Sequence, residues 1–141
     1  MALDQIFNIA GSALNAQTVR MNTTASNLAN SETVASNDKD AYRAKRANFK
    51  SVLEDSVRGL QGPYAGGVTV KSLINDNSPV RRVSDPGNPM ADQDGFIYMS
   101  NVNDMSEMVD MMSASRSYQN NVEVINTART LMSKTIDILK G

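Results

Sequence analysis

The chain has 141 residues with no cysteine and no histidine, and its 14 basic and 15 acidic side chains nearly cancel. This charge balance excludes an obvious electrostatic attraction to nucleic acid. No apolar run is long enough to span a bilayer, so no membrane insertion is predicted. The missing residue types remove thiolate and imidazole ligands and the Ser-His and Cys-His pairs of hydrolases. We therefore expect no metal site, no cofactor, no catalytic residue and no enzymatic activity.

The first predicted element is an amphipathic helix over residues 3–30, about 40 Å long and free of proline. Its apolar residues recur every seven positions, at Phe7, Leu14, Met21 and Leu28. The segment lacks the basic start and compact apolar centre of a cleaved secretion signal. Only Asp4 and Arg20 are charged, and the other faces carry hydroxyls and amides such as Asn27 and Asn30. Because water-facing helix surfaces usually carry several charges, we expect neighbours on more than one side.

The centre of the chain, residues 31–103, is rich in Gly, Pro, Asn, Asp and Ser and holds nine basic and nine acidic residues. Alternating apolar residues predict a strand over residues 68–74, and Phe96–Met99 predicts another. Asp85–Pro89 predicts a turn in which proline sets φ and Gly87 supplies a positive φ. The centre is therefore expected to be a small β insertion with loops.

One basic segment stands out between Ala41 and Leu53, where no acidic residue occurs. Its bases are Arg43, Lys45, Arg46 and Lys50. The segment is predicted to be extended or weakly structured. Its bases would contact an acidic partner or a cell-wall polymer, or they would form a solvated strand face, which is the more frequent outcome for such a pattern.

The last predicted element is a helix from about residue 104 to 139, about 50 Å long. Its apolar residues again recur at seven-residue spacing, at Met111, Tyr118, Ile125, Met132 and Leu139, with Val122 beside them. The run Asp104-Met105-Ser106-Glu107 resembles a capping box, in which Asp104 and Glu107 bond the free amides of the first turn. The methionines near its start, Met105, Met108, Met111 and Met112, indicate either an adaptable surface or ordinary core filling.

Two such helices either pair into an antiparallel hairpin within one chain or also pack against neighbouring chains. The near absence of charge in residues 5–30 favours neighbours, because a hairpin leaves more than half of each helix facing water. The predicted fold class is mainly α, with long N- and C-terminal helices packed as a coiled coil and a small central β-hairpin and loop insertion. The predicted domains are an N-terminal assembly helix (1–30), the central insertion (31–103) and a C-terminal assembly helix (104–141).

Specific strings resemble the flagellar rod and hook family of axial proteins. Ala25–Asn30 is similar to the family's N-terminal signature, in which a helix ends in an Asn-Leu-Ala-Asn turn before the central domain. Further strings, in the family's order, resemble one type of rod protein: Tyr42–Lys45, Asp85–Pro89 leading to Gly95 and Asn101-Val102, and Met112–Gln119 continuing to Thr127. The chain departs from the family in Ser31–Asp40, where the family's Thr-x-Gly pattern is replaced by another sequence.

The resemblance implies a structural subunit of the proximal rod in the flagellar basal body, exported unfolded through the flagellar type III apparatus. It implies polymerisation through the terminal helices into the drive shaft that transmits torque across the periplasm. The implied partners are further copies, other proximal-rod proteins, the distal rod protein and adaptor proteins of the motor ring and export gate. The predicted assembly interface comprises Phe7, Leu14, Met21, Asn27, Leu28, Asn30, Met111, Arg116, Tyr118, Val122, Ile125, Met132 and Leu139.

Two other functions compete with this interpretation. The same heptads would suit a soluble coiled-coil adaptor or chaperone-like dimer, with folded termini and a size independent of concentration. A cell-wall hydrolase that opens peptidoglycan would need a catalytic acid in a cleft. Its candidate acids, Glu32, Glu54, Glu107 and Glu123, are expected in loops or at exposed helix positions, and no cleft is predicted around them.

Overall fold

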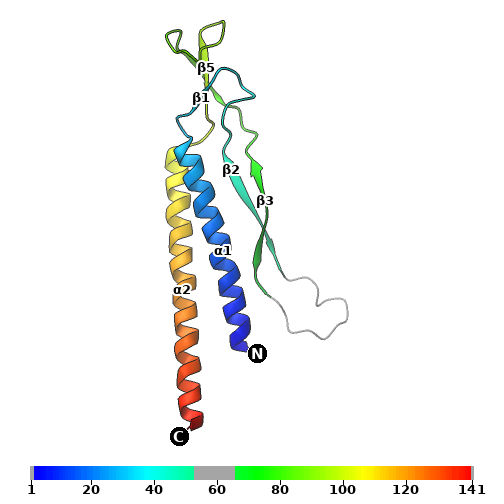
Figure 1. The fold of residues 1–141 in the computed structure, drawn as a ribbon, viewed down its shortest axis with the longest axis vertical. Helices are drawn as coiled ribbons and strands as arrows, with labels where there is room; N and C mark the ends of the chain where they lie inside the picture. The colour runs from blue at the N-terminus through cyan, green and yellow to red at the C-terminus, as the bar shows by residue number, and fades with distance from the viewer. Residues whose placement is uncertain (1, 53–65, 141) are drawn as a thin grey trace, which may run out of the picture.

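A computed structural model describes residues 2–52 and 66–140 and shows two long helices lying side by side (Figure 1). The first, α1, spans Ala2–Ala29, and the second, α2, spans Asp104–Lys140, so both predicted helices are confirmed close to their expected bounds. They run antiparallel, with both termini at one end of the molecule, and α2 extends beyond the start of α1 (Figure 1). The described residues contain no helix with the length and hydrophobicity needed to cross a bilayer.

Small side chains make the closest contact between the two helices. Ala10 on α1 is 3% exposed, and Ala114 and Ala128 on α2 are 0% and 4% exposed. Because the distance between packed helices depends on the side chains at the contact, alanines let the two backbones approach closely. Among the described residues, the largest fully buried side chains are Glu107, Asn27 and Ser100. The apolar core is therefore thin, and the largest of the fully enclosed side chains are polar.

The capping residue of α2 differs from the prediction by one position. Asn103 caps the helix, since its Oδ1 accepts the N–H of Ser106 at 3.0 Å and its carbonyl accepts the N–H of Glu107 at 3.0 Å. The predicted capping box on Asp104 and Glu107 is therefore wrong. Glu107 is 1% exposed and turns toward α1, so its carboxylate is not available to the first turn of its own helix.

The described strands form two antiparallel sheets. The first is a two-stranded ribbon of β2 (Lys45–Ser51) and β3 (Val68–Asn75), with a register shift between Asn48 and Phe49. In the second, β5 (Phe96–Met99) lies between β1 (Val34–Ala35) and β4 (Arg81–Ser84). The two predicted strands, now β3 and β5, are confirmed. The strand β2 lies in the segment that was predicted to be extended or weakly structured, and β1 and β4 were not predicted.

The predicted fold class, mainly α with a small β insertion, is therefore wrong. About half of the described chain is helical and about a fifth lies in strands, so the molecule is an α and β structure with two sheets. The sequence carries no signal for β4 and only a weak one for β2, because both are polar and almost wholly exposed, with no alternation of apolar residues. Such strands are held by their ladder partners and not by a buried face of their own.

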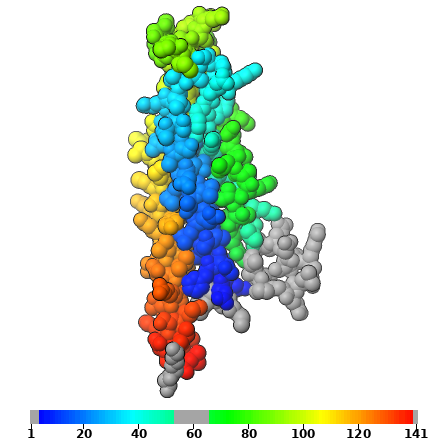
Figure 2. All heavy atoms as spheres, viewed as in Figure 1, coloured from blue at the N-terminus to red at the C-terminus, as the bar shows by residue number. Residues whose placement is uncertain are grey.

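The β2–β3 ribbon lies against α1, as the space-filling view shows (Figure 2). Ser12 on α1 fixes the end of the ribbon at Val68, because the Ser12 hydroxyl accepts the N–H of Val68 at 3.1 Å and donates to the Ile9 carbonyl at 2.8 Å. Gly67 has a φ of 147°, and a Cβ there would lie 2.8 Å from the Ser12 Oγ. Glycine is therefore required where the ribbon meets the helix.

The loop between β4 and β5 contains two turns. The predicted turn at Asp85–Pro89 is present, closed by a bond from the Asn88 N–H to the Asp85 carbonyl at 3.2 Å. The expected positive φ at Gly87 is wrong, because in the described ranges only Gly67 and Gly95 have positive φ. A turn with proline at its second position forms without a positive φ when it is of type I.

Asp92 organises the second turn. Its carboxylate accepts the N–H groups of Phe96 and Asp94, both at 2.9 Å, and the Tyr98 hydroxyl at 3.3 Å. These bonds favour the charged form, so they lower the pKa of Asp92, with the Phe96 N–H as the largest cause.

We expect the β4–β5 hairpin to lose order in acid. Because the folded pKa of Asp92 is lowered, its stabilisation is complete above the ordinary Asp value of 3.8 and is lost as the pH falls through the folded value. The NMR protection factor of the Phe96 amide should fall in that pH window, and Asp92→Ala should already lower it at neutral pH. A protection factor that stays constant throughout this window would contradict the assignment.

Candidate functional site

Most residues predicted for assembly lie on the faces where α1 and α2 meet. Those half-buried in the single chain are Phe7, Leu14, Met21, Leu28, Met111, Tyr118, Val122, Ile125 and Met132. Arg116 is exposed, and Leu139, near the free end of α2, is 81% exposed. Most heptad residues are therefore partly covered in a single chain, and their participation in contacts between subunits stays a prediction.

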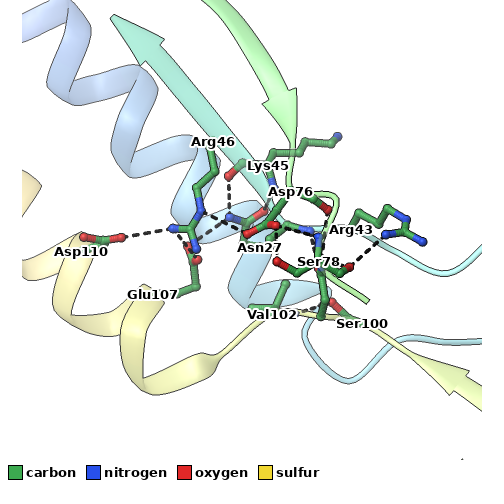
Figure 3. Close-up of polar contacts among 12 residues, drawn as sticks. Asn27, Arg43, Lys45, Arg46, Asp76, Ser78, Ser100, Val102, Glu107 and Asp110 are labelled. Atoms are coloured by element: carbon green, nitrogen blue, oxygen red, sulfur yellow. Dashed lines mark hydrogen bonds and ion pairs between the residues drawn. The ribbon is translucent and has the colours of Figure 1, made fainter. Parts of the chain in front are cut away.

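Asn27 connects the end of α1 to two other elements (Figure 3). Its amide nitrogen donates to the Lys45 carbonyl at 2.8 Å and to Glu107 Oε2 at 3.0 Å. Its amide oxygen accepts the Lys45 N–H at 2.8 Å and the Tyr42 hydroxyl at 3.1 Å. All four hydrogen-bonding positions of this side chain, which is 1% exposed, are used within one chain. Asn30 remains local, donating to the Ser26 carbonyl at 2.8 Å.

Arg46 holds the carboxylates of α2 on the other side of this contact. Its Nη1 lies 3.2 Å from Glu107 Oε1, as an ion pair without the alignment of a hydrogen bond, and donates to Asp110 Oδ2 at 3.3 Å. Arg20 of α1 donates to the other oxygen of Asp110 at 3.0 Å. Figure 3 shows Arg46 reaching from β2 to both acids. We call Arg20, Asn27, Arg46, Glu107 and Asp110 the polar junction.

Asn101 ties the ends of the strands to the same region. Its amide oxygen accepts the Ala44 N–H at 2.8 Å, and its nitrogen donates to the carbonyls of Asp76 and Ser78 at 3.1 and 3.0 Å. The Ser78 hydroxyl donates to Asp76 at 2.6 Å, and this bond is the main cause of the lowered pKa of Asp76. The start of β2, the end of β3 and the segment before α2 are thus fixed together.

A cavity of about 320 Å³ opens beside the polar junction, lined in part by Arg20, Arg46, Glu107 and Asp110. Glu107 was expected to be exposed, and this expectation is wrong because the carboxylate is buried between Asn27 and Arg46. Both acids of the cavity are bound to arginine, an arrangement that fixes elements in place. Glu32 and Glu123 are exposed, and Glu54 lies outside the described residues.

Large apolar side chains remain at the surface of α2. Met105, Met108, Val109 and Met112 are 51–74% exposed, and Ile138 and Leu139 near the free end are each 81% exposed. Contiguous apolar surface of this kind marks sites of protein contact. Within one chain, the polar junction gives the polar groups on the inner side of the helices their hydrogen-bond and ion-pair partners. Part of the outer side of the helices stays apolar and exposed.

Sequence reasoning identified Asn27 but missed its partners Tyr42 and Glu107. It also missed the ion pairs that Arg46 makes with Glu107 and Asp110. The one available signal was the basic segment, for which an acidic partner was weighed against a solvated strand face. Arg46 does have acidic partners, but they are on α2 of the same chain. Lys45 instead lies over the Tyr42 ring, 5.7 Å from its centroid.

Comparison with known proteins relates both ends of the chain to flagellar rods. The family "Flagella basal body rod protein" matches residues 7–35, and "Flagellar basal body rod FlgEFG protein C-terminal" matches residues 93–138. Flagellar basal-body rod protein FlgC of Salmonella typhimurium and that of Yersinia enterocolitica are each 49% identical over 138 residues, with 98% of both chains covered. FlgC of Buchnera aphidicola subsp. Schizaphis graminum is 44% identical over 140 residues, with the same coverage.

Paired terminal helices with an apolar outer surface, together with these matches, define an axial structural protein of the bacterial flagellum. Identity near one half across almost the whole length then narrows the class. The chain belongs to the FlgC family of flagellar basal-body rod proteins. It is a structural component of the basal-body rod and not an enzyme, and it associates there with other basal-body proteins. The resemblance found in the sequence is thereby confirmed.

We expect Asn27→Ala to destabilise the chain by about 2–4 kcal/mol, because it removes the hydrogen-bond partner of the Lys45 N–H and of Glu107 Oε2. Thermal unfolding followed by circular dichroism measures the loss. Asn22→Ala, at an exposed position of the same helix, is the matched control and should change stability by less than about 0.5 kcal/mol. Equal midpoints for the two variants would show that the polar junction does not hold the helices.

Proposed function

We propose that the chain builds the proximal rod by polymerising through its two terminal helices, giving the drive shaft that transmits torque across the periplasm. The observation that carries this proposal is the apolar surface left on α2 after the helices have paired. Exposed fractions of 51–81% at six large side chains are costly in water and are removed when a neighbour covers them. The subunit would therefore gain its remaining burial on assembly.

The arrangement of the ends also suits a tube. Both termini lie at one end of the antiparallel pair, and the two helices run along the long axis of the molecule (Figure 1). Contacts between unlike faces of successive copies that do not close into a ring generate an open helical array. Many weak contacts distributed along helices about 42 and 55 Å long would give such an array its stiffness.

The polar junction would couple the helices to the sheets during rotation. Two arginines and two carboxylates join α1, β2 and α2 by charge-assisted contacts of 3.0–3.3 Å. Such contacts have a fixed geometry, and Glu107 is shielded from solvent. A load applied to the outer sheets would then reach the helices through bonds and not through a loose loop.

Export through the flagellar type III apparatus is part of the same proposal. The thin apolar core and the small buried side chains support it, because little apolar contact must be lost before the chain can be threaded unfolded. The proposed partners are further copies, other proximal-rod proteins, the distal rod protein and adaptor proteins of the motor ring and export gate.

The rival function is a coiled-coil adaptor that forms a discrete dimer through the same helices. Basal bodies purified from the source bacterium separate the two. A rod subunit should be recovered in the rod fraction, and deletion of its gene should leave basal bodies that stop short of the distal rod and cells that do not swim. Recovery of the chain as a dimer outside basal bodies, with intact rods in the deletion strain, would overturn the proposal.

We expect amide exchange in the isolated subunit to be slowest at the polar junction and fastest toward the free end of α2. The reason is that residues 131–139 are mostly exposed, including Leu131, Ile136 and Ile138, while residues near Glu107 are tied to α1. In purified basal bodies the same end should become protected. Uniform protection along α2 in the subunit would contradict coupled ordering and assembly.

A further inference from the structure

The first turns of α2 carry an apolar face that points away from α1. Met105, Met108, Val109 and Met112 are 74%, 51%, 60% and 55% exposed. Their spacing of three, four and seven residues places them on one side of the helix. The acids between them, Glu107 and Asp110, turn inward to Arg46 and do not interrupt this face. We call these four residues the methionine patch.

The methionine patch sets narrow requirements for what can cover it. Unbranched methionines adapt to a groove, and their burial favours a surface without charges, because an unpaired ion buried there would be costly. Small side chains on the other surface would let long ones insert between them, as knobs insert into holes in a coiled coil. A helix with small, uncharged residues at spacings of three and four meets both requirements.

The outer side of α1 has this composition. Small and uncharged residues alternate at spacings of three and four, and all are exposed: Asn8, Gly11, Asn15, Thr18, Asn22, Ala25 and Ala29. A Cβ added at Gly11 would meet nothing within 4 Å, so the face is open there. The Thr18 hydroxyl already donates to the Leu14 carbonyl at 2.9 Å, which leaves the methyl group free for apolar contact. We call these seven residues the uncharged stripe.

The two faces cannot meet within one chain. Helical spacing places the methionine patch opposite Ala114, which is 0% exposed against α1, and places the uncharged stripe away from both Ala10 and Ser12. Each copy therefore presents both faces outward at once. A contact between them joins two copies through unlike surfaces, which is the type of contact that extends into an open array.

We propose that the methionine patch of one copy packs on the uncharged stripe of a second copy, an inference that rests on the proposed rod function. The position of this contact along the two helices can be measured. Because Asn27 bonds Glu107, the patch lies level with Ala25 and Ala29 of its own chain. An unshifted neighbour would place Met108 beside Ala25, and each step along the stripe would shift the copies by about 5 Å.

Disulfide trapping tests the pairing cleanly because the chain has no cysteine. Met108→Cys would be combined in turn with cysteine at Ala25, Asn22, Thr18, Asn15 or Gly11, and basal bodies would be oxidised and separated on a non-reducing gel. We expect ladders of cross-linked copies, at least tenfold above background, from one stripe position or two adjacent ones. The matched control combines Met108→Cys with Thr69→Cys, an exposed position on β3, and should give no ladder.

Other results would overturn the pairing. A dimer formed by Met108→Cys alone would mean that the patch meets itself, and a cross-link only to a different rod protein would mean another occupant. No ladder from any stripe position, in basal bodies that contain the variants in normal amount, would refute the pairing and leave the rod function intact. Wild-type chain missing from basal bodies would refute the rod function itself. A series at Val109→Cys repeats the test where a Met108 variant fails to restore swimming.

Discussion

The structure depends on one buried contact, the bond between the Asn27 amide and the Glu107 carboxylate. Two groups that are each 1% exposed fix the level of α1 against α2, since neither can slide without losing a bond in a place that water does not reach. Arg46 supplies the positive charge that stabilises the buried Glu107 carboxylate. Lys45 and Tyr42 bond the remaining hydrogen-bonding positions of the Asn27 amide. Alanine contacts alone would hold the helices together without specifying their register.

This division of labour explains the composition of the chain. Because polar bonds in a small region specify the fold, the apolar residues of the helices do not all have to be buried in a thick core. Much of that apolar surface stays outside, on α2, while the outer side of α1 carries no charge from Asn8 to Ala29. A water-soluble two-helix protein with no partner would place lysine and glutamate there. The surface is that of a rod component whose environment is other protein.

The helices could be predicted from the sequence because their seven-residue repeats and the absence of proline are local signals. Alternating apolar residues and the Phe96–Met99 run marked β3 and β5 in the same way. The strand β4 could not be predicted, and β2 was predicted only as an extended or weakly structured segment, because nearly all of their side chains face solvent and their order comes from partners distant in sequence. The same limit applies to the polar junction. Asn27 was recognised through a family signature, but its bond to a glutamate 80 residues later follows only from the packed fold.

Reasoning from neighbouring residues alone placed the Glu107 carboxylate wrongly, and the reason is physical. An acidic residue three positions after a capping residue is normally expected to bond a free N–H group at the start of its own helix. Here Asn103 already caps α2 and the acid faces Asn27, so the local role is filled by one residue and the long-range role by another. Because that acid turns inward, the methionines on either side of it form a continuous apolar face. The contact that sets the register inside one chain therefore also creates the uncharged surface available to the next.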